Sequence, residues 1–169
     1  MLGTIRALFL PPSPKAVRDT YIALVAAARN PFFYTRLEVP DTIDGRFDLI
    51  VIHLFLIEHR VTQASEAALQ KREVFCRQLS EAFVDDLDAN LRELGVADTG
   101  VSLRMKRMGK AYHGRLQAYS AALHDATALR SALARNLYGT LAHGNVNTLL
   151  AMESYMHQLQ TILAATPLE

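Results

Sequence analysis

Apolar residues recur every three or four positions along most of the chain, and alternation with a period of two is nearly absent. This spacing places apolar side chains on one face of an α-helix, so the sequence predicts an all-α fold. The 169 residues contain no internal repeat and no low-complexity linker, and the length suits one domain. We therefore expect a single domain, residues 1–169, folded as a bundle of five to seven helices.

Proline, glycine and capping residues indicate where the helices begin and end. Ser13 and Pro14 suit the N-cap and the first turn of the first helix, which Asn30-Pro31 ends. Gly95 is the expected C′ residue of the third helix, and His143-Gly144 breaks the chain before the last one. The predicted helices span about 14–29, 46–64, 66–94, 100–123, 125–138 and 145–163, and residues 31–43 are predicted to form a loop.

The helix predicted at about 46–64 is apolar on nearly every side, with a run from Phe47 to Ile57. A helix of this kind belongs at the centre of a bundle or against the apolar surface of a partner, and we place it at the centre. We expect Phe32, Phe33 and Tyr34 to pin the preceding loop onto the core, with an exposed aromatic patch as the alternative. The inward stripes of the later helices are predicted to include Leu69, Phe75, Leu79, Phe83, Leu87, Leu91 and Leu94; Val101, Met105, Met108, Tyr112, Leu116, Tyr119 and Leu123; and Val146, Leu149, Leu150, Met156 and Leu159.

Charge is balanced overall but unevenly distributed. The net charge is +1, so the molecule as a whole has no field that recruits nucleic acid. Residues 81–98 contain six acidic residues and one basic residue, Arg92, whereas residues 99–124 carry only basic charges. Two interpretations stay open: pairing between these segments, or a basic surface for an anionic membrane, ribosomal RNA or an acidic partner. The candidate partner-binding residues are Arg104, Met105, Arg107, Met108, Lys110, Tyr112 and Arg115.

No catalytic constellation, cofactor motif or metal site is predicted. The six histidines include no pair at the i, i+4 spacing of a helical metal site, and Cys76 is the only cysteine. Asp86-Leu-Asp-Ala-Asn90 begins like a calcium loop but lacks the required glycine and glutamate, so Asp88 is instead expected to pair with Arg92. A small-molecule binder for quinone, haem or lipid and an enzyme of unrecognised type stay open as alternatives.

The chain shows no signal peptide and no membrane span. Its N-terminal segment, Met1–Leu10, lacks the long apolar region of a signal peptide. Its longest apolar run, Leu49–Ile57, is less than half of a membrane span. We expect a soluble cytoplasmic protein, at most peripheral to the inner membrane.

Several motifs in order resemble the ubiquinol–cytochrome c chaperone family over about residues 33–138. They are Pro40-Asp41, Asp44-Gly45-Arg46-Phe47-Asp48, Asp88-x-Asn90-Leu91-Arg92-Glu93-x-Gly95-Val96 with Asp98, Tyr112-x-Gly114-Arg115, Tyr119-x-x-Ala122-Leu123 and Ala132-Leu133-x-Arg135-Asn136-Leu137-Tyr138. The resemblance implies an assembly factor without catalytic residues. Mitochondrial members hold newly made cytochrome b near the ribosome exit until it acquires haem and enters the cytochrome bc1 complex.

By this resemblance the chain is a bacterial relative that binds nascent or newly inserted cytochrome b, close to the ribosome or an anionic membrane surface. DNA is not an expected partner. The mitochondrial members also work with a small partner protein, and the sequence identifies no such partner here.

Overall fold

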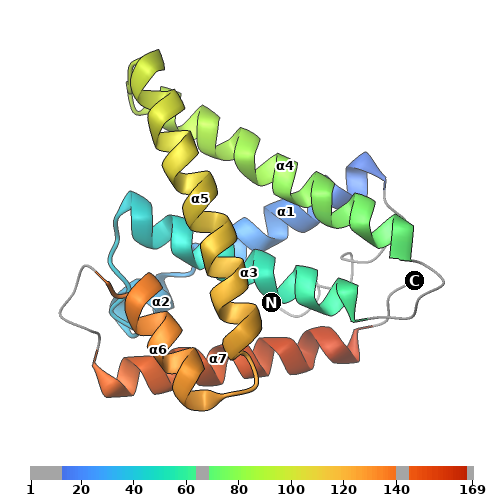
Figure 1. Ribbon diagram of the computed structural model, residues 1–169, viewed down its shortest axis with the longest axis vertical. Helices are drawn as coiled ribbons and strands as arrows, with labels where there is room; N and C mark the ends of the chain where they lie inside the picture. Colours follow the sequence, from blue (N-terminus) through green and yellow to red (C-terminus); the bar gives the residue numbers. More distant parts are fainter. Residues whose placement is uncertain (1–12, 64–68, 140–144, 167–169) are drawn as a thin grey trace.

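The structure is a computed structural model that describes residues 13–63, 69–139 and 145–166. Within these ranges the chain forms α-helices and no strand, which confirms the predicted all-α bundle (Figure 1). None of these helices offers an apolar stretch long enough to cross a membrane. The helices are α1 (Pro14–Ala28), α2 (Pro31–Thr35), α3 (Ile43–Thr62), α4 (Leu69–Glu93), α5 (Asp98–Ala122), α6 (Ala126–Asn136) and α7 (Val146–Ala165).

Capping side chains explain where the helix boundaries differ from prediction. The Thr42 hydroxyl accepts a hydrogen bond from the Gly45 N–H at 3.1 Å, so α3 begins three residues earlier than expected. The Asn30 side chain accepts from the Phe32 N–H at 2.9 Å and starts α2, where a loop was predicted. Gly95 has a φ of 74° and follows α4 as predicted. The predicted break at His143-Gly144 lies outside the described residues.

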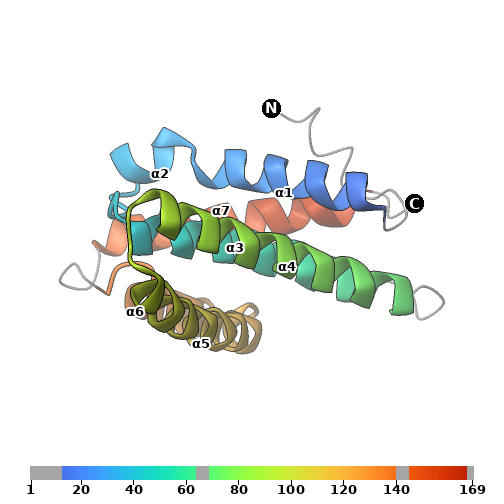
Figure 2. The same ribbon diagram turned by 90° about the horizontal axis from the view of Figure 1, so that it is seen from above.

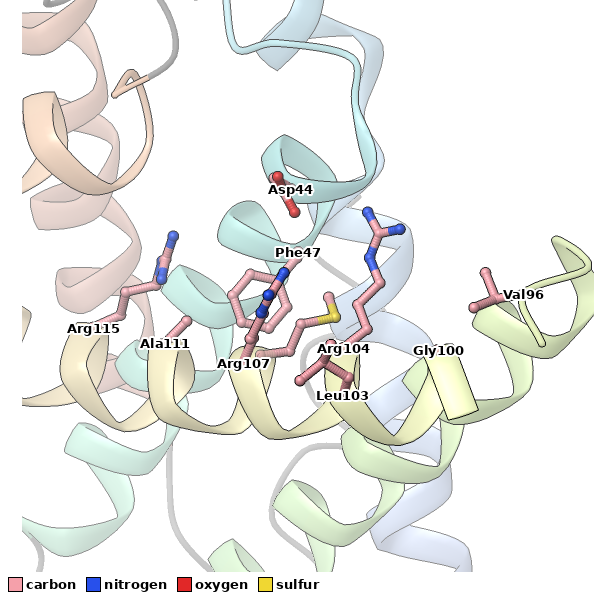
Figure 3. A pocket seen from close by; sticks show the side chains of 10 residues that line it. Asp44, Phe47, Val96, Gly100, Leu103, Arg104, Arg107, Ala111 and Arg115 are labelled. Atoms are coloured by element: carbon pink, nitrogen blue, oxygen red, sulfur yellow. The ribbon is translucent and has the colours of Figure 1, made fainter. Parts of the chain in front are cut away.

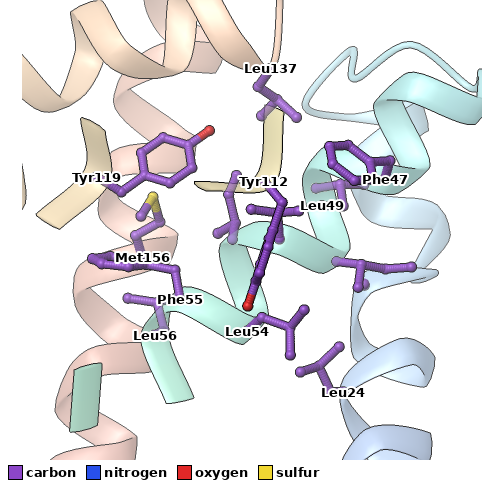
Figure 4. Packing of buried hydrophobic residues seen from close by; sticks show 14 of the residues in the cluster. Leu24, Phe47, Leu49, Leu54, Phe55, Leu56, Tyr112, Tyr119, Leu137 and Met156 are labelled. Carbon is purple, nitrogen blue, oxygen red and sulfur yellow. The ribbon is translucent and has the colours of Figure 1, made fainter. Parts of the chain in front are cut away.

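Helix α3 occupies the centre of the bundle, as its composition predicts. Residues 47–57 are all buried, and α3 packs against α1, α4, α5 and α7. Figure 2 shows α1 and α5 on opposite sides of α3. Side chains from these surrounding helices converge on α3 in the core (Figure 4). An apolar helix covered in this way keeps its apolar surface from water on every side.

Five predictions about individual apolar side chains have mixed outcomes. Phe33 is buried and pins its segment to the core, whereas Phe32 is 48% exposed. Leu94, Val146 and Leu150 were expected inside but are exposed. Leu94 lies beyond the last residue of α4, and the other two face away from the buried stripe of α7. The side chain of Leu69 lies outside the description.

A buried histidine ties α7 to α3. The His53 Nδ1–H donates to the Leu49 carbonyl oxygen at 2.7 Å, which leaves Nε2 to accept from the Tyr155 hydroxyl at 2.6 Å. The Phe33 ring lies edge-on to both the His53 and the Tyr155 rings. Burial lowers the pKa of His53 to about 4, so the ring is neutral at neutral pH.

A second link joins the C-terminal ends of the same two helices. The Arg60 guanidinium donates to the Leu163 carbonyl at 2.8 Å and to the Thr166 carbonyl at 3.2 Å. The Leu163 carbonyl also accepts from the Thr166 N–H at 3.2 Å, and Thr166 is the residue that follows α7. The positive charge also lies at the negative end of the helix dipole. Arg60 therefore both caps α7 and holds it against α3.

Replacing His53 with Gln and measuring stability as a function of pH tests whether His53 is buried in its neutral form. The folded pKa lies below the usual value of 6.5, so the unfolded state takes up the proton first. The stability that neutral His53 provides is complete above about pH 6.5 and is lost as the pH falls towards 4. Urea unfolding should show the wild-type advantage over His53→Gln shrinking by roughly 2–3 kcal/mol between pH 7 and 4.5. An advantage that stays constant with pH would contradict this assignment.

Candidate functional site

An open groove of about 620 Å³ lies between the start of α3, the α4–α5 turn and the first half of α5 (Figure 3). Its volume is in the range of binding sites for small molecules or for a few side chains of a larger partner. The lining residues are Asp44, Phe47, Val96, Gly100, Leu103, Arg104, Arg107, Met108, Ala111 and Arg115. We call Leu103, Arg104 and Arg107 the groove rim, and Phe47 and Met108 the groove floor.

The groove floor is apolar and belongs to the protein core. Phe47 and Met108 are buried, and the Phe47 ring packs against that of Phe83 with 5.7 Å between centroids. The Arg115 guanidinium lies over the Phe47 ring at 5.3 Å from its centroid. Leu103, by contrast, is 53% exposed on α5. A large exposed leucine beside a buried phenylalanine creates an apolar surface that a partner can cover.

A buried ion pair holds this floor in place. The Arg115 guanidinium of α5 pairs with the Asp48 carboxylate of α3, and the Asp48 side chain is 4% exposed. Burial raises the pKa of the Asp48 carboxyl, while the charge of Arg115 acts in the opposite direction. Because Asp48 is buried and the Arg115 side chain is only 19% exposed, removing either one leaves its partner largely shielded from water without a counter-charge. The pair therefore favours this position of α5 against α3.

A second polar cluster lies deeper between α3, α4 and α5. The hydroxyls of Tyr112 and Ser80 donate to the same oxygen of the Glu58 carboxylate, at 3.0 and 2.9 Å. Burial raises the pKa of Glu58, and these two hydrogen bonds oppose the rise. The cluster joins three helices and does not reach the groove lining.

The structure separates the seven predicted partner-binding residues into three groups. Arg104 and Arg107 line the groove, and Lys110 is exposed on α5 outside the lining. Met105 packs partly against the core. The remaining three serve the interior: Met108 is buried in the floor, Tyr112 bonds to Glu58, and Arg115 pairs with Asp48.

Of the two interpretations of the charge distribution, pairing between the acidic and basic segments is not observed among the described residues. Arg92 forms ion pairs with two of the acidic side chains. The pair with Asp88, at 2.5 Å, was predicted, and the pair with Asp98, at 2.7 Å, was not. Among the residues that the structure describes, the four cations of α5 before Arg115 form no ion pair. These four are Arg104, Lys106, Arg107 and Lys110. Their charges face solvent and any partner that binds there.

Sequence reasoning missed several of the lining residues, of which Asp44, Phe47 and Leu103 matter most. Leu103 carried a usable signal, because it falls outside the apolar stripe of its helix and lies four residues before Arg107. An apolar side chain on an otherwise basic helical face indicates a contact with something other than water. Phe47 and Asp44 carried no such signal, since their place in the groove depends on how α3 meets α5.

The groove combines an apolar floor with charged side chains. Its described lining contains one carboxylate and three guanidinium groups, and no hydroxyl, thiol or imidazole. Within the described ranges, no three histidine, cysteine or acidic side chains come together as metal ligands. The groove offers an apolar contact next to fixed positive charges.

Comparison with known proteins gives two matches. The family model described as "Ubiquinol-cytochrome C chaperone" matches residues 35–169. The match extends through α7, beyond the range 33–138 that contains the recognised motifs. A solved structure, the "Crystal structure of the Cbp3 homolog from Brucella abortus", is 36% identical with a TM-score of 0.75, covering 89% of this chain and 81% of that chain. No curated protein matches the chain.

Separating the partners of the buried ion pair tests its role. Asp48→Asn leaves the Arg115 charge without its counter-ion, so we expect a loss of about 3 kcal/mol in the free energy of unfolding. A double variant, Asp48→Leu with Arg115→Met, removes both charges and should recover most of that loss. Urea unfolding of the three proteins measures this. Equal losses in the single and double variants would show that the two charges do not depend on each other.

Proposed function

Because the chain belongs to the ubiquinol–cytochrome c chaperone family, we propose that it is a non-enzymatic assembly factor of the cytochrome bc1 complex. Its proposed client is newly made cytochrome b, which it holds until the client enters the complex. The observation that carries the proposal is the groove between α3 and α5, with its apolar floor and its rim of exposed leucine and arginine side chains. The family supports a chaperone role, and the groove supplies a surface for a client.

The size of the groove limits what it can cover. A volume of about 620 Å³ accommodates a few side chains, far less than a helix that spans a membrane. The proposed mode of action is therefore recognition of one short segment. Met108 in the floor suits this task, because the flexible thioether side chain adapts to apolar groups of different shapes.

We further propose that the chain acts close to the place where cytochrome b is made, at the ribosome exit or at the cytoplasmic surface of the membrane. Cytochrome b is very hydrophobic, so its segments aggregate if they meet water before insertion. A chaperone that covers such a segment is needed between the synthesis of cytochrome b and its assembly. It must therefore be present where that synthesis takes place.

Crosslinking in cells that make a bc1 complex, followed by affinity purification and mass spectrometry, tests the client. We expect the wild-type chain to recover cytochrome b. Leu103→Asp places a charge in the groove rim and should lower the recovery several-fold. Leu150→Asp makes the same change at a similarly exposed leucine of α7 and serves as the matched control. A strain without the chain should have less bc1 complex, measured from the cytochrome spectra of its membranes.

Two results together would contradict the proposed function. One is the absence of cytochrome b from material crosslinked to an abundant, folded wild-type chain. The other is a normal amount of bc1 complex in the strain that lacks the chain.

A further inference from the structure

The two sides of the groove differ in charge. Arg104 and Arg107 extend from α5 on one side, and Asp44 belongs to the first turn of α3 on the other (Figure 3). Phe47 and Leu103 add apolar atoms to the same lining. A ligand that fits must therefore present a negative charge towards α5 and an apolar group towards the floor.

The two arginines of the rim have no counter-ion among the described residues. Nearby cations have internal partners, since Arg92 pairs with Asp88 and Asp98, and Arg115 pairs with the carboxylate beneath the floor. Neither rim arginine forms an ion pair with a described residue. A planar guanidinium next to an apolar wall suits a carboxylate, which it binds through two parallel hydrogen bonds.

We propose that the groove binds a protein segment in which an apolar side chain and a carboxylate lie about one helical turn apart. The apolar side chain rests on Phe47 against Leu103, and the carboxylate pairs with Arg107 and Arg104. The inference rests on the proposed function, because it assigns the client's segment to this groove. It adds the chemical feature by which the client is selected.

The groove suits a protein segment better than RNA or a lipid surface. A nucleic acid or an anionic membrane presents many phosphates, and its binding grows with every cation that it reaches. Here Asp44 stands opposite the rim arginines, while Lys106 and Lys110 lie outside the groove lining. The apolar floor also has no counterpart in a phosphate backbone. A single carboxylate beside an apolar side chain matches all three features.

The phenylalanine of the floor is held in place before any ligand arrives. Phe47 is fixed between the ring of Phe83 and the guanidinium of Arg115, which in turn is paired with Asp48. A site with this degree of order loses little conformational entropy on binding. The rim side chains are exposed or half-buried and provide the remaining adjustment.

A photo-crosslinking amino acid at Leu103 tests the inference in cells that make a bc1 complex. The photo-reactive side chain is itself apolar, so it preserves the character of the rim. Val84, which is 44% exposed on α4 and does not line the groove, is the matched control position. We expect position 103 to capture a peptide with an Asp or Glu within about four residues of the linked site, and position 84 not to capture it.

Charge reversal at two adjacent positions separates the groove from general attraction. Arg107 lines the groove, whereas Lys106 is exposed on the same helix outside it. Arg107→Glu should reduce the crosslink from position 103 about tenfold, because it replaces a charge-assisted pair with repulsion. Lys106→Glu makes the same change in net charge and should alter the yield less than twofold. Circular dichroism and thermal unfolding check that both variants fold.

Each outcome decides between the inference and the proposed function. An acidic and apolar peptide from cytochrome b supports both, and such a peptide from another protein supports the inference but overturns the proposed client. Nucleic acid, lipid or no adduct at position 103, or equal losses in the two charge variants, overturns the inference. Cytochrome b captured at position 84 alone leaves the proposed function standing and also overturns the inference.

Discussion

The complete burial of α3 is the constraint on which the structure depends. Residues 47–57 are covered on every side, but apolar contacts have no direction and do not determine which helix lies where. The polar residues within this run supply the missing direction. Asp48 requires Arg115 from α5, and His53 requires Tyr155 from α7. Because a buried polar group without a partner costs several kcal/mol, each of these pairs fixes one neighbour of the central helix.

The groove follows from the same constraint. Phe47 directly precedes Asp48, so the ion pair that positions α5 also positions the floor, and Arg115 contributes to both by lying over the Phe47 ring. The groove is thus built on the core and not on a loop. Its rim is different, because the side chains of Leu103 and Arg107 are exposed. The protein combines a floor that the fold dictates with a rim that the fold leaves free.

Periodicity and capping residues were sufficient to predict the central place of α3 and each described helix except α2, because these features depend on neighbours in sequence. They were not sufficient for the site. Arg115 and Tyr112 looked like partner-binding residues because residues 99–124 contain no acidic side chain, yet their partners are Asp48 and Glu58 on α3. Such long-range pairs depend on how helices cross, which a periodic pattern does not encode. Four of the predicted partner-binding residues, Arg104, Arg107, Met108 and Arg115, do line the groove. Leu103, an apolar residue on a basic face, was a further signal that the prediction did not use.

Several residues of the motifs that carry the family resemblance stabilise the fold. Asp48 and Arg115 come from two different motifs and meet as the buried ion pair. Gly45 belongs to the first of these motifs, and a Cβ at this position would lie 2.0 Å from the Pro40 carbonyl oxygen. Tyr138, in the last motif, donates a hydrogen bond across the core to the Leu37 carbonyl at 2.8 Å. The residues of the groove rim lie outside these motifs and form no comparable contact in the core of the described chain. A chain can therefore keep the motifs and the fold while its rim changes, which fits the proposal that the rim selects the client.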